Sequence, residues 1–305
     1  MSWIVFVLIG QFLNALVVVG DKHIVTAKIV SRPIIYTFYV GLLSMVALFA
    51  LPFGVTLPSS AIILPSLLAG LFFVLSIYLL YESLKNSDPS DTLPVIGGVS
   101  ALITFFGSYV ILGEGLPSHF FTGFFILIVG MVFISHFKFN RTVIYELVGS
   151  GVFFGMSTIL LKVVFLNDTF INGFFWSRMA NVFVVLLLLL LPGVYGLLVN
   201  EERAHTAVTN KNKKRPSTSS KILFVLGNKA LAGVAFFCIL IAIKFGNVSM
   251  INALAATQYI FLFIFAIIWK KALPGYFSDS TYKHELIHKV FATSLIVIGF
   301  IVLFI

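Results

Sequence analysis

Ten apolar stretches of helix length occupy nearly all of this 305-residue chain. A helix that crosses a bilayer needs about 20 predominantly apolar residues, so ten crossings need roughly 200. Hydrophobic residues make up 60% of the chain and charged residues only 10%, which is too little charge to cover a soluble domain of this size. The sequence therefore predicts an integral membrane protein. The predicted segments are 3–29, 33–52, 61–82, 93–112, 119–136, 144–165, 170–192, 222–243, 248–269 and 288–305.

The apolar runs are continuous rather than alternating, which favours helices over the strands of a membrane barrel. Only two connections are long and polar, 200–221 and 271–289, and neither could bury a core of its own. The predicted fold class is an all-α membrane bundle of ten transmembrane helices. The first segment has no basic stretch before it, so we expect a retained helix rather than a removed signal peptide. The single cysteine, Cys238, excludes a disulfide framework.

The net charge of +9 is unevenly distributed. Five of the 20 Lys and Arg residues lie between Arg203 and Arg215, in a loop that has no aromatic residues to stack on bases. A cytoplasmic loop near anionic lipid explains this cluster better than nucleic-acid binding does. Basic residues follow the odd-numbered segments, while the loops after even-numbered segments carry almost none. The positive-inside rule then places both termini outside the cell.

Ten segments divide into two sets of five, 1–139 and 140–305, and an odd number of helices per set inverts the second set relative to the first. Such inverted repeats are common in secondary transporters. The connection 83–93 in the first set parallels 242–252 in the second, since each has a Lys after an apolar helix end and then a short polar hinge. The stretch 106–117 parallels 263–274 more loosely, with the same order and spacing.

These motifs resemble those of the ten-helix EamA-type members of the drug/metabolite transporter superfamily. Ser83–Lys85 and Ala242–Lys244 are similar to the family's hinge between the third and fourth helices of each half, and Leu112–Glu114 is similar to its Leu-Gly-Glu. The basic residue that the family often carries in the second helix of a repeat has a counterpart in Arg178. The corresponding first-half position, near Tyr39, is not basic, and Trp269–Lys271 replaces a second Leu-Gly-Glu.

The resemblance implies a secondary transporter in the cell membrane that moves a small organic metabolite by alternating access. Its two halves would rock about a central cavity lined by the first, third, fourth, sixth, eighth and ninth helices. It also implies that both termini lie in the cytoplasm, opposite to the orientation that the charges predict. The resemblance is compatible with an exporter or with a facilitator. It is also compatible with a monomer or with a homodimer.

Charged residues inside the segments are the first functional candidates, because each costs at least ~2.5–3.5 kcal/mol in a bilayer. Lys22 and Lys162 hold equivalent positions in the two halves and are predicted to form a pseudo-symmetric pair; snorkelling to the headgroups is the alternative. Arg178 lies about eight residues into its apolar run, where snorkelling is harder. A guanidinium there suits a carboxylate or phosphate, so we expect an anionic or zwitterionic substrate. Asp21 and Glu82 are the candidate proton carriers.

Uncharged polar residues inside the segments supply further candidates. Asn14 and Gln258 are predicted to line the cavity with Arg178; hydrogen bonds between helices, worth ~0.6 kcal/mol on average, are the alternative. Gly151 and Gly155 form a small-xxx-small pair that predicts close helix packing.

One motif points to different chemistry. His284-Glu285-Leu286-Ile287-His288 matches the H-E-x-x-H of zinc proteases. A third ligand is needed, and no Asp, Glu, His or Cys occurs between Lys289 and Ile305. We therefore expect no metal, no cofactor and no enzymatic activity. The alternatives to a transporter are a membrane enzyme acting on lipid or peptide and a membrane scaffold.

Overall fold

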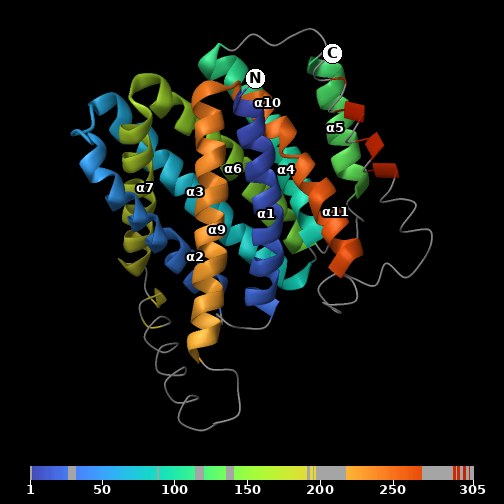
Figure 1. The fold of residues 1–305 in the computed structure, drawn as a ribbon, viewed down its shortest axis with the longest axis horizontal. Coiled ribbons are helices and arrows are strands. Elements are labelled where there is room, and N and C mark those ends of the chain that lie inside the picture. The colour runs from blue at the N-terminus through green and yellow to red at the C-terminus, as the bar shows by residue number, and fades with distance from the viewer. Residues whose placement is uncertain are drawn as a thin grey trace.

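The computed structural model describes residues 2–26, 32–87, 89–113, 120–134, 141–190, 193–194, 196, 218–269 and scattered positions between 291 and 302. The described residues are mostly helical and contain no strand (Figure 1). In chain order the elements are α1 (Ser2–Thr26), α2 (Pro33–Leu42), η1 (Leu43–Phe53), α3 (Ser60–Asn86), α4 (Pro89–Gly107), η2 (Ser108–Leu112), α5 (Phe120–Ile134), α6 (Arg141–Asn167), α7 (Phe170–Leu187), η3 (Leu188–Leu190), α9 (Thr218–Phe245), α10 (Val248–Leu254) and α11 (Thr257–Trp269).

Seven of the helices in this part of the chain are long and apolar enough to cross a membrane, and two more are apolar but shorter. The first nine predicted segments each coincide with a helix or a pair of consecutive helical elements. The tenth, 288–305, and the loop 200–221 lie largely outside the described residues. The prediction of an all-helical, multi-pass membrane protein is confirmed.

Polar side chains cap the first turns of α7 and α10. Thr169 caps α7 by accepting a hydrogen bond from the backbone N–H of Asn172, and Asn247 caps α10 by accepting from that of Met250. These caps satisfy N–H groups that have no partner inside the helix. α10 and α11 form one interrupted helix, because the chain turns at Ala255 and Ala256 between them.

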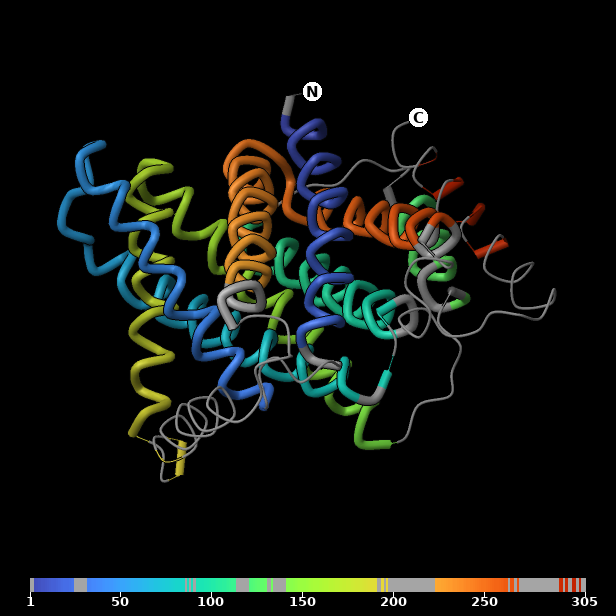
Figure 2. Tube along the Cα trace, turned by 60° about the horizontal axis from the view of Figure 1, so that its bottom comes forward, coloured from blue at the N-terminus to red at the C-terminus, as the bar shows by residue number. Residues whose placement is uncertain are grey.

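The helices pair across the two halves of the chain. α3 packs along α6, and α1 packs along α9, while α4 packs on α6 and α1 on α11. α2 contacts α7, and α4 contacts α10. Figure 2 shows α2 and α7 at one end of the molecule and α5 and α11 at the other, with α1 and α9 between them. Much of the packing of the described helices is therefore between the two halves.

Glycine permits the closest of these contacts, as predicted for helix α6. A Cβ atom at Gly151 would lie 2.7 Å from the Ile96 carbonyl oxygen, and one at Gly155 would lie 2.9 Å from the Ile103 Cβ atom. The nearby α3–α6 contact is reinforced by Ser76 and Ser150, whose hydroxyls each donate to the other's carbonyl at 2.9 Å. Small and hydroxyl side chains thus replace bulk where α6 meets α3 and α4.

Candidate functional site

Arg178 lies in the middle of α7 and is 8% exposed. Its guanidinium carbon sits over the ring of Phe236 on α9, 4.3 Å from the ring centroid, and over the ring of Phe73 on α3, at 5.2 Å. The two rings contact each other edge to face with centroids 5.4 Å apart. Arg178 is therefore held at the meeting point of three helices, one from the first half and two from the second.

The close approach of α3 and α7 depends on Gly70. A Cβ atom at Gly70 would lie 2.9 Å from the Ala180 carbonyl carbon, so a larger residue would force the two helices apart. Gly70 lies about one turn before Phe73, and Ala180 lies two residues after Arg178. This contact fixes the height at which the Phe73 ring meets the guanidinium.

The hydrogen-bonding capacity of Arg178 is not met. Its Nε atom is buried and has no partner. Within the described part of the chain no carboxylate pairs with it: Asp21 pairs instead with Lys229, and Glu82 with Lys85. A desolvated cation–π contact contributes about 2 kcal/mol. Burying an ion costs several kcal/mol even after relaxation, so the two rings offset only part of that cost.

A second unsatisfied atom lies one turn further along α7. Asn181 is fully buried, and its Oδ1 atom has no partner, although its amide nitrogen is 3.4 Å from the Ser44 hydroxyl. Residues three apart on a helix lie on neighbouring parts of one face. α7 thus presents two unmet polar groups, one donor and one acceptor, on adjacent turns.

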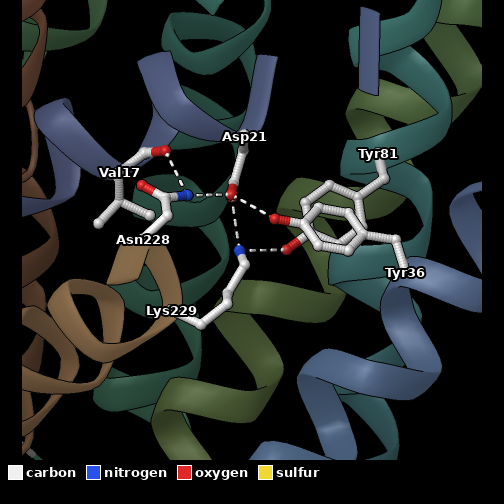
Figure 3. Close-up of polar contacts among 6 residues, drawn as sticks. All are labelled: Val17, Asp21, Tyr36, Tyr81, Asn228 and Lys229. Atoms are coloured by element: carbon white, nitrogen blue, oxygen red, sulfur yellow. Dashed lines mark hydrogen bonds and ion pairs between the residues drawn. The ribbon is translucent and has the colours of Figure 1, made fainter. Parts of the chain in front are cut away.

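A separate polar cluster, shown in Figure 3, surrounds Asp21 near the carboxyl end of α1. Lys229 on α9 pairs with the Asp21 Oδ1 atom at 2.6 Å. The Tyr36 hydroxyl on α2 and the Asn228 amide on α9 each donate to the same oxygen at 2.7 Å. The Lys229 ammonium also donates to the Tyr81 hydroxyl on α3 at 3.1 Å. We call these five residues the Asp21 cluster.

The Asp21 cluster joins four helices. The Lys229 ammonium lies over the Tyr36 ring, 4.6 Å from its centroid, and the two tyrosine rings are 4.4 Å apart. Asn228 donates a further hydrogen bond to the Val17 carbonyl at 3.2 Å. Because both charges are buried and matched, the cluster is electrically neutral and highly connected. Such an arrangement holds α1, α2, α3 and α9 in one relative position.

The structure places Lys22 and Lys162 at equivalent contacts. The Lys22 ammonium donates to the carbonyls of Leu84 and Ser87 at the end of α3, at 3.1 and 2.9 Å. The Lys162 ammonium donates to the carbonyls of Ile243 and Gly246 at the end of α9, at 3.0 and 2.8 Å. A cation at a helix carboxyl end satisfies unpaired carbonyls and complements the helix dipole.

Asn14 and Gln258 are both half-buried, on α1 and at the second residue of α11. No hydrogen bond joins either of them to Arg178 within the described residues. Lys22 and Lys162 contact the carboxyl ends of α3 and α9, whereas Arg178 contacts Phe73 and Phe236 within these helices. The predicted site residues are thus distributed over several places, and their role in substrate binding stays a prediction.

Sequence reasoning missed the partners of these residues. Lys229 lies inside the predicted segment 222–243, and the rule that selected Arg178, a charge inside an apolar run, applies to it equally. No signal in the sequence separates Phe73 and Phe236 from the other 32 of the 34 phenylalanines. Their importance comes from contacts between helices.

Among the residues that the structure describes, no group of three or more His, Cys, Asp or Glu side chains is placed to hold a metal ion. The His284–His288 motif lies outside the described residues.

Neither a known family model nor a curated protein matches this sequence. Solved structures do match the fold. One, described only as a crystal structure of a protein, aligns with 97% of this chain and 95% of its own, with a TM-score of 0.63 and 18% identity. At that identity the likeness establishes the fold alone. The fold and its buried charges define a multi-pass, all-helical membrane protein.

Proposed function

We propose that this chain is a secondary transporter of a small organic metabolite, acting as an exporter or facilitator by alternating access. The observation that carries the proposal is Arg178, a buried cation that has no counter-ion among the described residues and is enclosed by rings from α3 and α9. An intramembrane charge is costly and is retained where it serves a substrate or ion pathway. The proposal places the chain among EamA-type carriers.

The helix contacts support two inverted five-helix repeats. The exchange of the two repeats replaces α1 by α6, α3 by α9, and α4 by α10 with α11, and vice versa. It turns the α1–α9 contact into the α6–α3 contact, and the α4–α6 contact into the contact of α10 and α11 with α1. Under the same exchange the Lys22 contact with the end of α3 becomes the Lys162 contact with the end of α9. A pseudo-two-fold relation between the halves accounts for all of these pairs.

The interruption between α10 and α11 also favours a carrier. Discontinuous helices at the repeat interface are typical of substrate sites in secondary transporters. Asn252, near the end of α10, has a buried amide nitrogen without a partner, and Thr257 begins α11. α10 packs on α4, and Ser249 on α10 hydrogen-bonds the Ser108 hydroxyl of η2.

Transport is tested with purified protein in proteoliposomes that are offered a pooled metabolite library, with uptake measured by mass spectrometry. Selective accumulation that Arg178→Gln abolishes is the expected result. Arg141→Gln is the matched control, because it removes the same charge at an exposed position at the start of α6. Failure of folded, correctly inserted protein to accumulate any compound contradicts the proposal and favours a membrane enzyme or a scaffold.

A further inference from the structure

We infer that the Arg178 site takes a monocarboxylate with an apolar or aromatic body. The inference names the substrate class of the site described above, and as a statement about transport it rests on the proposed function. Binding to the site is a separate property and can be measured without transport. Three observations carry the inference: the unmet Nε–H group of Arg178, its charge and the character of the surrounding side chains.

The unmet Nε–H group of Arg178 requires an acceptor oxygen. A phenyl ring attracts a cation but does not replace an oxygen as a hydrogen-bond acceptor, so contact with Phe73 and Phe236 leaves the Nε–H group unpaired. A carboxylate accepts two parallel hydrogen bonds from the fork of a guanidinium. It would satisfy Nε–H and a neighbouring N–H together.

The number of charges selects a monoanion. The buried Lys229 already has Asp21 as its counter-ion, and Lys22 and Lys162 are engaged by helix-end carbonyls. Because no carboxylate of the described residues pairs with Arg178, this side chain contributes one positive charge that they leave uncompensated. A single carboxylate neutralises it. A phosphate monoester carries about −1.5 to −2 at neutral pH and would leave negative charge buried, at a cost of several kcal/mol per ion.

A zwitterion would bury an uncompensated positive charge, where a phosphate would bury a negative one. Its carboxylate would pair with Arg178, but its ammonium would need a counter-charge. The unmet group one turn away is the Asn181 Oδ1 atom, which is an uncharged acceptor. An amide oxygen supplies one hydrogen bond and no negative charge, so a buried ammonium beside it would stay uncompensated.

The surroundings of the site select the body of the ligand. Phe174 lies one turn before Arg178 on α7 and contacts Phe237 on α9 edge to face, with centroids 5.5 Å apart. Phe237 is 42% exposed, but Phe174 and Phe236 pack against one hydrophobic core cluster. An apolar or aromatic body buries favourably against such rings, and edge-to-face contacts add about 0.5–1.5 kcal/mol each.

The test uses probes that share a phenylpropyl skeleton. Binding to the full chain in nanodiscs is measured by calorimetry for hydrocinnamate, its neutral amide, phenylalanine and phenylpropyl phosphate, with acetate as the truncated acid. We expect hydrocinnamate to bind at least about tenfold more tightly than each of the others, because only it pairs a monoanion with an aromatic body. Tighter binding of the phosphate ester or of phenylalanine overturns the inference.

Variants locate the binding. Arg178→Gln is expected to weaken hydrocinnamate binding by about tenfold or more, and Arg178→Lys by less, because an ammonium keeps the charge but loses the planar fork. Arg141→Gln is expected to leave binding unchanged. Equal weakening by Arg178→Gln and Arg141→Gln overturns the inference. If Arg178→Gln does not fold, the comparison of hydrocinnamate with its amide on the native chain decides.

Transport and binding outcomes separate the two proposals. Hydrocinnamate that binds through Arg178 and is never accumulated by proteoliposomes upholds the monocarboxylate site and contradicts transport. Arg178-dependent accumulation of another solute, with no binding of hydrocinnamate, upholds transport and overturns the monocarboxylate site.

Discussion

Asp21 and Lys229 form a buried ion pair with an N–O distance of 2.6 Å, although 208 residues separate them in the chain. The pair links α1 of the first half to α9 of the second. Two tyrosines and an asparagine complete its coordination. It therefore constrains the relative position of the two halves at one end of the bundle.

Breaking this pair is predicted to be strongly destabilising. Asp21→Asn leaves the buried Lys229 ammonium without its counter-ion, and a loss of about 3–5 kcal/mol is expected. Denaturant unfolding of the detergent-solubilised protein measures it. Glu82→Gln is the control, because its pair with Lys85 is partly exposed and worth about 0–1 kcal/mol. An Asp21→Asn variant as stable as the control contradicts a structural role for the pair.

Removing both charges together is predicted to restore much of the stability. Asp21→Leu combined with Lys229→Met replaces the pair by apolar side chains, which is often neutral or favourable for buried pairs. The double variant should therefore unfold at higher denaturant concentration than either single variant. Losses that simply add would mean that the two charges do not act as a unit.

Lys22→Met and Lys162→Met are predicted to destabilise the protein by similar amounts. Each removes the donor from two or more carbonyls at a helix end, and about 1–3 kcal/mol is expected for buried acceptors left unpaired. Thermal unfolding compares the two variants with Lys85→Met, whose side chain is exposed. If only one of the two substitutions lowers the melting temperature, the two lysines do not contribute equally to stability and the prediction is wrong.

Arg178→Met is predicted to separate stability from function. Since the rings offset only part of the cost of burying the guanidinium, replacing it with an apolar chain of similar length should leave the melting temperature unchanged or raise it. Uptake should be abolished in the same preparation. A marked loss of stability would show instead that Arg178 is a structural residue.

Two glycine substitutions test the packing of α6. Gly151→Ala places a Cβ atom 2.7 Å from the Ile96 carbonyl oxygen and is predicted to cost about 1–3 kcal/mol through overpacking. Gly98→Ala in α4 meets no atom within 4 Å and is predicted to be neutral or to stabilise by up to about 1 kcal/mol. Equal effects in unfolding experiments would show that α6 and α4 can separate without cost.

Much of the architecture could be read from hydropathy. Helices occupy the described residues of the predicted segments from 3–29 to 248–269, because backbone groups in a bilayer must be satisfied within the segment and continuous apolar runs meet that requirement as helices. The depth of Arg178 in its run predicted that it faces a cavity or an acidic partner; the structure places it against the rings of Phe73 and Phe236. The matching positions of Lys22 and Lys162 predicted their matching contacts.

The partners of these residues were decided only by the tertiary structure. A membrane helix that is apolar on all sides carries little information about which face meets which neighbour. The rotation of α9 determines that Lys229 reaches Asp21 and that Phe236, among 34 phenylalanines, covers Arg178. That rotation follows from close contacts of α1 with α9, such as Gly10 against Ile239 and Gly20 against Asn228, which depend on shape rather than on hydropathy.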